Sequence, residues 1–263
     1  MTATSTESRD WEDVVVPDAD NARRPSLWDQ AQEWGVALEF AATHLSKNLV
    51  DRWPVGDGHP VLVLPGFLAG QVSTIHLRNL LNRLGYDAHD WALGRNYGYR
   101  EDMEEKMHAL IADLRERHGR SVSLIGWSLG GIYAREIARA VPDHVRQVIT
   151  LGSPFRGNHQ ATRAYRLYQF LNRNPLNEDM MSETARISRA APLPVPSTSI
   201  YSRTDGIVAW ECCTSLPAPQ TENIEVRSTH LGYGFNLETM FVVADRLALP
   251  EGQWRPYRRA VAS

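Results

Sequence analysis

A short turn at residues 126–130 constrains this chain most strongly. It reads G-W-S-L-G around Ser128, directly after a strand-like run at residues 122–125 and directly before a helical pattern at residues 129–141. Glycines two positions from the serine let neighbouring backbone come close, and the sharp turn holds the serine in a strained conformation. The hydroxyl therefore projects above the end of a strand at a helix N-terminus, which favours negative charge. This strand–turn–helix arrangement predicts a serine nucleophile.

The rest of the chain alternates between strand-like and helical segments. Strands that alternate with helices are joined by right-handed crossovers, which build a parallel sheet covered on both faces. The predicted fold class is therefore α/β, with a mostly parallel central sheet and helices on both faces. We expect strands at residues 61–64, 86–93, 121–127, 145–151, 195–201 and 223–227, and helices at residues 26–50, 72–84, 101–118, 129–141 and 236–248.

One insertion interrupts this alternation. Two helical segments, at about residues 161–172 and 177–190, follow one another with no strand between them, and a proline-rich turn ends the second. We predict that the insertion, at about residues 155–196, forms a helical cap over one end of the sheet.

The N-terminus differs in character from the remainder. Residues 1–25 have no periodic apolar pattern and are predicted to form a flexible segment, so residues 26–263 make up the folded domain. Ser26, with Asp29 three positions later, is the expected N-cap of the first helix.

Composition excludes several classes of protein. The 263 residues carry 28 basic and 31 acidic side chains, a net charge of −3, which offers no basic surface for nucleic acid. No apolar run approaches the roughly 18 residues of a membrane span. The polar, acidic N-terminus does not resemble a secretory signal, so we expect a cytoplasmic protein without an integral membrane segment. The adjacent Cys212 and Cys213 cannot join distant segments and are expected to be reduced thiols.

A serine hydroxyl is a weak nucleophile and needs a base, usually a histidine that a carboxylate orients. In a sheet of this type the three residues follow the order serine, acid, histidine. Asp205 and His230 fit that order, and each follows a predicted strand, as Ser128 does. His159, in the insertion, is the one other histidine worth testing. Nearby carboxylates that end a strand less well are Glu211, Glu222 and Glu225.

An oxyanion formed at the serine needs two hydrogen-bond donors. The backbone N–H of Leu129, directly after the nucleophile, is the first expected donor. The second should come from the loop after the strand at residues 61–64, where Gly66 permits a tight bend and Phe67 is best placed to offer its N–H.

Together these motifs resemble the bacterial lipase and esterase branch of the α/β-hydrolase superfamily, over about residues 55–250. The resemblance implies an α/β-hydrolase fold and hydrolysis of a small-molecule carboxylic ester, with no cofactor and no metal. Ser128 would form an acyl-enzyme, His230 would move the proton and Asp205 would orient His230. Capture of the acyl group by an alcohol, which is acyl transfer, uses the same mechanism. The matching segments are residues 64–67, 126–131, 202–208 and 228–232.

Two alternatives stay open at this point. An amidase or peptidase could use the same three residues, because fold and triad do not set the leaving group. A non-catalytic binding module of the same fold would be expected to lose the serine, the acid or the histidine, whereas all three are present. The sequence gives no information on oligomeric state.

Overall fold

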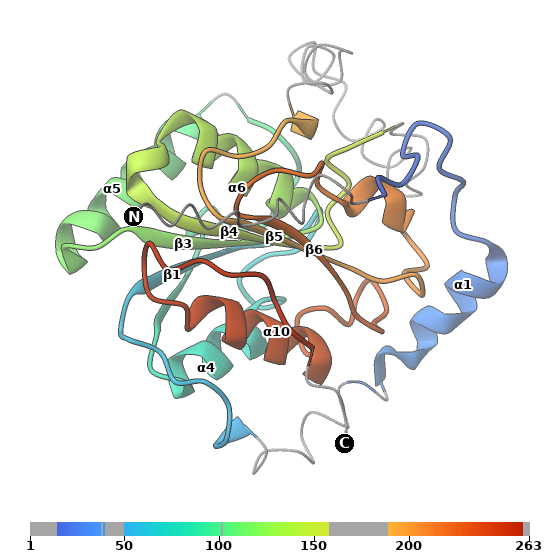
Figure 1. Cartoon of the computed structure of the whole chain (residues 1–263), viewed down its shortest axis with the longest axis horizontal. Coiled ribbons are helices and arrows are strands. Elements are labelled where there is room, and N and C mark those ends of the chain that lie inside the picture. The colour runs from blue at the N-terminus through green and yellow to red at the C-terminus, as the bar shows by residue number, and fades with distance from the viewer. Residues whose placement is uncertain (1–14, 38, 40–49, 101, 158–188, 260–263) are drawn as a thin grey trace, which may run out of the picture.

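Six parallel strands form one sheet at the centre of the molecule (Figure 1). The computed structural model describes residues 15–37, 39, 50–100, 102–157 and 189–259, and the sheet lies within these ranges. The strands lie side by side in the order β2-β1-β3-β4-β5-β6. The predicted α/β class with a parallel sheet is confirmed, and every pairing in the described sheet is parallel.

Burial explains which strands the sequence located well. β1 (Pro60–Leu64), β3 (Val122–Trp127) and β4 (Val145–Leu151) are buried at every residue, as expected for strands covered on both faces. β5 (Ser197–Tyr201) is buried at all but its last residue. The edge strands β2 (Asp87–Asp90) and β6 (Thr221–Glu225) are polar and partly exposed. They are shorter or shifted relative to the predicted strands at residues 86–93 and 223–227, because an edge strand lacks a continuous apolar pattern.

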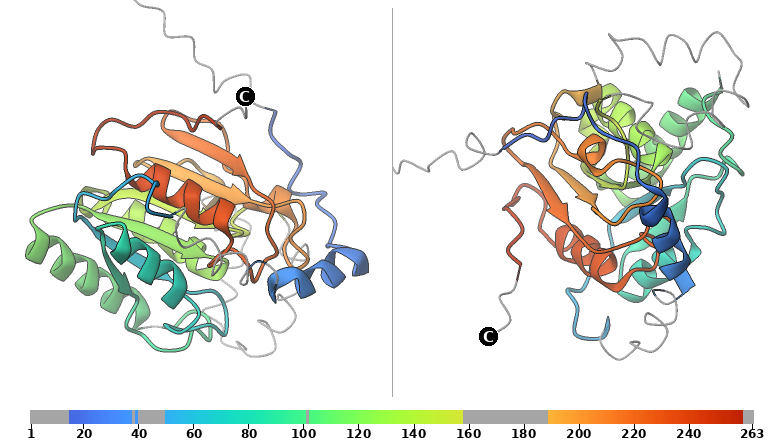
Figure 2. Two further views of the ribbon diagram at one scale, coloured as in Figure 1. Left: turned by 90° about the horizontal axis from the view of Figure 1, so that it is seen from below. Right: turned by 90° about the vertical axis from the view of Figure 1, so that its right-hand side faces the viewer.

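Helices cover both faces of the sheet, as predicted. α5 (Met103–His118) and α6 (Leu129–Ala140) pack on one face, and α4 (Ile75–Arg83) and α10 (Leu237–Leu247) pack on the other (Figures 1 and 2). Alternate residues of β1 enter the two cores, since successive side chains of a strand point to opposite faces. Val61 and Val63 pack with α4 and α10, whereas Leu62 and Leu64 pack with α5 and α6.

The first helix lies outside these two layers. α1 (Leu27–Gln32) begins at Ser26, whose hydroxyl accepts the Asp29 N–H while the Asp29 carboxylate accepts the Ser26 N–H, which confirms the predicted cap. The 3-10 turn η1 (Glu33–Gly35) follows. Most of the remaining predicted helix, which extended to residue 50, lies outside the described residues.

The described part of the N-terminal segment contacts the domain. Ala19 is buried, and the Arg156 guanidinium donates to the Pro17 carbonyl at 3.0 Å. Residues 1–14 of the predicted flexible segment lie outside the described residues. Cys212, beside Ala19, and Cys213 are free and buried, and burial raises the pKa of the Cys212 thiol to about 12. Both therefore remain protonated thiols at neutral pH.

The predicted cap falls mainly on residues 158–188, which lie outside the described residues, as does His159. The chain re-enters the described structure above α6. The Arg135 guanidinium donates to the carbonyls of Arg189 and Ala191 at 3.1 and 2.9 Å, and also lies over the Phe155 ring. The returning end of the predicted insertion is thus fixed to α6, the helix that directly follows Ser128. No helix within the described ranges combines the length and apolar character of a membrane span.

Candidate active site

Ser128 occupies a strained turn between β3 and α6. Its backbone has φ 52° and ψ −118°, a region that residues with side chains rarely adopt. The Ser128 N–H donates to the Leu151 carbonyl of the neighbouring strand at 2.9 Å, which fixes the turn above the sheet. The half-buried side chain stands at the N-terminus of α6, where the helix dipole favours negative charge. Strain of this kind persists only where surrounding structure holds it.

The glycines of the motif let three pieces of backbone meet at this turn. A Cβ atom on Gly126 would overlap the backbone of Gly131, and one on Gly130 would overlap the Leu64 carbonyl. On Gly130 it would also lie 2.8 Å from the Pro65 carbonyl oxygen. Side chains at either position would therefore separate the serine turn from the loop that follows β1.

Asp205 and His230 meet Ser128 across the ends of three different strands. The His230 Nε2 lies 3.1 Å from the Ser128 hydroxyl oxygen, and the His230 Nδ1 lies 2.7 Å from an Asp205 carboxylate oxygen. The other Asp205 oxygen accepts the N–H groups of Ile207 and Val208 at 2.9 and 2.8 Å. With Nδ1 donating to Asp205, Nε2 is left to accept the serine proton. The structure thus brings together the three residues that the sequence singled out.

The surroundings of His230 adjust its proton affinity. Burial lowers the pKa of this imidazole, but the charge of Asp205 and its hydrogen bond outweigh burial, and Glu33 adds to them, so the pKa is raised above 6.5. A raised pKa makes the neutral ring a stronger base. The Asp205 carboxylate would stabilise an imidazolium if the ring accepted the proton of Ser128.

The loop after β1 lies against the nucleophile, as the oxyanion prediction requires. A Cβ atom on Gly66 would lie 3.2 Å from the Ser128 Cβ. Phe67 follows and is half-buried, and Leu68 turns the loop with a positive φ of 61°. Leu129 is the first residue of α6, where backbone N–H groups have no partner within the helix. Both predicted donor positions are therefore next to Ser128 in space or in sequence.

Asn96 holds this loop in place, and sequence reasoning missed it. Its side-chain amide donates to the Pro65 carbonyl at 2.9 Å, and its backbone carbonyl accepts the Leu68 N–H at 2.6 Å. Its backbone N–H donates to the Ala69 carbonyl at 2.8 Å. Asn96 is fully buried, so these bonds are shielded from water.

Glu33 of η1 is a second residue that sequence reasoning missed. One of its carboxylate oxygens accepts the His230 N–H at 2.7 Å and the Gly206 N–H at 2.9 Å. The other accepts the Leu231 N–H at 3.2 Å. A single side chain thereby joins the loop that carries the acid to the loop that carries the histidine.

Glu39 reinforces the same region from the same stretch of chain. Its carboxyl group accepts the Thr229 N–H at 2.9 Å and the Ser228 hydroxyl at 3.1 Å. On the other side, the Trp127 indole N–H donates to the His230 carbonyl at 3.1 Å. The backbone around His230 is therefore held by the residue before the nucleophile and by two acidic side chains that precede the sheet.

Two of the other candidate carboxylates have partners away from His230. Glu222 pairs with Arg246 at 3.1 Å, and Glu225 pairs with Arg203 at 3.2 Å. Among the described carboxylates, Asp205 is the one placed against the His230 ring, and Glu33 reaches the backbone instead.

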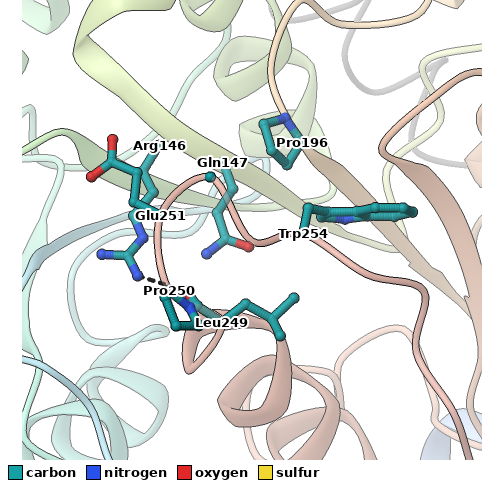
Figure 3. Close-up of a pocket in the computed structure, with 8 residues that line it drawn as sticks. Arg146, Gln147, Pro196, Leu249, Pro250, Glu251 and Trp254 are labelled. Carbon is teal, nitrogen blue, oxygen red and sulfur yellow. Dashed lines mark hydrogen bonds between the residues drawn. The ribbon is translucent and has the colours of Figure 1, made fainter. Parts of the chain in front are cut away.

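A pocket shown in Figure 3 lies elsewhere. Arg146 and Gln147 stand at the start of β4, and Pro196 comes immediately before β5. The segment after α10 closes it, with Trp254 facing Pro196. Ser128 follows the end of β3, so the pocket and the serine lie at opposite ends of the sheet, and we do not assign this pocket to substrate.

Solved structures of similar shape identify the fold. A structure of the metagenome-derived lipolytic enzymes LipS and LipT matches 74% of this chain and 93% of its own, with a TM-score of 0.56 and 16% identity. Lipase B of Aspergillus fumigatus matches 75% of this chain and 54% of its own, with a TM-score of 0.55 and 16% identity. The fold is the α/β-hydrolase fold, as predicted.

Sequence relatives define the class. Mouse serine hydrolase BPHL is 28% identical over 143 residues, which are 50% of this chain and 49% of that protein, so the match spans about half of the relative. Fold, site and this relative make the chain similar to serine hydrolases of the α/β-hydrolase class, esterases and thioesterases among them. The family model for palmitoyl protein thioesterase matches residues 60–192, just over half of the 263 residues. The chain therefore belongs to the palmitoyl protein thioesterase family.

Proposed function

We propose that this hydrolase cleaves carboxylic esters and thioesters of small molecules through an acyl-enzyme on Ser128. The observation that carries the proposal is the continuous contact from the Ser128 hydroxyl through His230 to the buried Asp205. The palmitoyl protein thioesterase family match supports including thioesters.

The first half of the reaction forms the acyl-enzyme. As the Ser128 oxygen attacks the carbonyl carbon, His230 Nε2 takes the hydroxyl proton, and Asp205 stabilises the resulting imidazolium. The tetrahedral oxyanion accepts hydrogen bonds from the Leu129 N–H and from the loop after β1, where Phe67 is the proposed donor. His230 then gives its proton to the leaving alcohol or thiol as the bond to that group breaks.

The second half releases the acid. Water enters where the leaving group was, His230 takes one of its protons, and the water oxygen attacks the acyl-enzyme. The serine leaves with the proton that His230 returns. An alcohol in place of water would receive the acyl group by the same steps, which is the acyl transfer that the sequence analysis considered.

Two exposed apolar side chains, which follow His230 and Glu33 in the chain, support a substrate with an apolar acyl group. Leu231 is 47% exposed, and Trp34 is 86% exposed. The Leu231 N–H donates to the Glu33 carboxylate, and Trp34 directly follows Glu33 in the chain. Large apolar side chains kept in water next to a site are a surface on which an acyl chain can be buried.

The test compares the wild-type chain and Ser128→Ala on matched acyl series. The substrates are p-nitrophenyl acetate, butyrate, octanoate and palmitate, and the corresponding acyl thioesters. We expect turnover by the wild type, rising with acyl length from acetate to octanoate, and none above background in Ser128→Ala. The thioester-to-ester ratio of kcat/KM then assigns the preferred leaving group.

Ser121→Ala is the matched control, because Ser121 lies just before β3, at the opposite end of that strand from Ser128. It should leave kcat unchanged. Labelling of Ser128 by a fluorophosphonate without turnover of any ester or thioester would show an active serine and a wrong substrate class, and would direct attention to amides. Equal turnover by wild type and Ser128→Ala would reject the mechanism.

A further inference from the structure

A cluster of three potential metal ligands lies at the end of the sheet opposite Ser128. Asp87 and His89 are the first and third residues of β2, and His118 is the last residue of α5. One ligand atom from each lies within 4.8 Å of the other two. None of the three has a part in the ester chemistry proposed above.

The backbone brings these side chains together by regular geometry. Residues two apart on a strand point to the same face, and Ala88 between them packs in the core on the α4 side, so Asp87 and His89 face α5. α5 ends directly after His118, at Gly119, whose φ of 62° suits a left-handed helix cap. The end of α5 therefore lies over the start of β2.

The donor atoms converge closely. The His89 Nε2 and the His118 Nε2 lie 2.8 and 2.9 Å from the same Asp87 oxygen, and the two imidazole ring centres are 6.2 Å apart. Ligand atoms about 2.0 Å from a tetrahedral Zn²⁺ are about 3.3 Å from one another. The two nitrogen–oxygen distances are thus within a few tenths of an ångström of those around a bound ion.

Hydrogen bonding alone leaves one of these nitrogen atoms unsatisfied. The His89 Nε2 is buried from solvent and has no hydrogen-bond partner in the described part of the chain, although Asp87 is close. The 2.8 Å contact with Asp87 therefore does not have the geometry of an N–H···O bond, which weakens steeply away from linearity. A buried polar atom without a partner requires an explanation, and a bound ion supplies one.

The structure points to a divalent transition-metal site at Asp87, His89 and His118, and we propose that it binds Zn²⁺. Two imidazoles and one carboxylate suit zinc and its neighbours in the first transition series, whereas Mg²⁺ and Ca²⁺ prefer oxygen ligands throughout. The three side chains are 48%, 25% and 20% exposed, so water can complete the coordination. The bound ion would join edge strand β2 to the end of α5.

Isothermal titration of the chelator-treated full chain with ZnCl₂ tests the proposal. We expect one Zn²⁺ per wild-type chain and a melting temperature that rises with Zn²⁺ and falls again with chelator. Loss of an outer partner of a metal ligand already costs about 10–100-fold in affinity. His118→Gln, which removes a direct ligand, should therefore weaken binding by at least about 100-fold.

His144→Gln is the control, since His144 lies outside the cluster in η2 (Pro142–His144). It should bind Zn²⁺ as the wild type does, and Mg²⁺ should not compete. Without metal, the melting temperatures of wild type and His118→Gln should agree, which separates ligand loss from misfolding. The proposal is overturned if the wild type binds no tighter than His118→Gln, or if His144→Gln loses as much affinity. Ester hydrolysis should be the same with and without chelator.

Discussion

The two halves of the active site are held in place by different means. The Ser128 turn is fixed by its own backbone, through close contacts at Gly126 and Gly130 and the hydrogen bond from the Ser128 N–H to the Leu151 carbonyl. The loops that carry Asp205 and His230 are fixed instead by hydrogen bonds to side chains from a distant part of the chain, namely Glu33 and Glu39. The first half depends on the absence of side chains, and the second depends on the presence of two particular carboxyl groups.

The topology of a parallel sheet brings the three residues close together, but further contacts are needed to orient them. Parallel strands place their carboxyl ends at one edge of the sheet, so the three residues come near one another by topology alone. Topology does not set the angle of an imidazole at the end of a loop. A misplacement of about 1 Å can cost roughly 100-fold in rate, and the hydrogen bonds to Glu33 restrain the backbone that carries the imidazole.

The largest effect should come from the bond between Asp205 and His230, within the second half. Asp205→Asn removes the charge that orients and stabilises His230, and kcat should fall by about 10³–10⁴-fold while the protein stays folded. Steady-state kinetics on p-nitrophenyl butyrate and circular dichroism measure the two quantities. Glu225→Gln is the control, since Glu225 pairs with Arg203. Near-normal turnover in Asp205→Asn would move the acid role to another carboxylate.

The next largest effect on kcat should come from the close backbone contact at Gly130, in the Ser128 turn. Gly130→Ala places a Cβ atom against the Leu64 and Pro65 carbonyls, so the serine turn and the loop after β1 must separate. We expect kcat to fall by roughly 100-fold or more. Overpacking should also lower the free energy of unfolding by about 1–3 kcal/mol, measured by urea denaturation.

Gly234→Ala is the matched control for this substitution. The nearest atom to its Cβ would be a Trp127 ring carbon at 3.5 Å, an ordinary van der Waals distance. If both alanine variants behaved as the wild type does, the close backbone approach at residue 130 would not be needed for activity.

Glu33→Gln tests the hydrogen bonds that hold the loops of Asp205 and His230. The glutamine loses one acceptor oxygen and turns an N–H₂ group toward backbone donors, so kcat should fall by roughly tenfold or more. Because the Glu33 charge helps to raise the pKa of His230, its loss should also lower that pKa. The rate needs neutral His230, so the acid limb of the pH–rate profile should move to lower pH.

The shift of the acid limb to lower pH distinguishes a positioning role of Glu33 from general destabilisation of the fold. General destabilisation would not move the acid limb of the pH–rate profile. Asp29→Asn is the control, because it weakens the N-terminal cap of α1 without removing a contact to the loops. A pH profile of Glu33→Gln that coincides with the wild-type profile would contradict the assignment.

The smallest effect should be that of Glu39 on the pH dependence of the melting temperature. Burial raises the pKa of Glu39 above 4.5, against hydrogen bonds from Thr229 and Ser228 that lower it. Just above pH 4.5, the folded state therefore keeps a proton on the Glu39 carboxyl group that the unfolded state releases. The contribution of Glu39 to the free energy of unfolding falls as the pH rises through this range. The difference in melting temperature between Glu39→Gln and wild type should shift in favour of the variant from pH 5 to pH 7. A difference that is constant over this range would be the contrary result.

The same contrast explains what could be predicted from the sequence. Gly126, Ser128 and Gly130 form a contiguous motif, and Asp205 and His230 follow strands in a fixed order, so local pattern was enough. Glu33, Glu39 and Asn96 are isolated polar residues, and their importance rests on contacts with segments far away in the chain. The edge strands β2 and β6 were placed less accurately than β3 and β4, because half-exposed strands carry a weaker apolar signal.

The long sequence separation between Glu33 and its partners also affects when the site can form during translation. Glu33 is synthesised 197 residues before His230, to whose backbone N–H it bonds. At about 5–20 residues per second, roughly 10–40 s of translation separate the two. The Ser128 turn can form on a nascent chain well before then, but the complete set of contacts at the histidine cannot. The contacts of Glu33 with the histidine loop therefore form only after the loop that carries His230 has been synthesised.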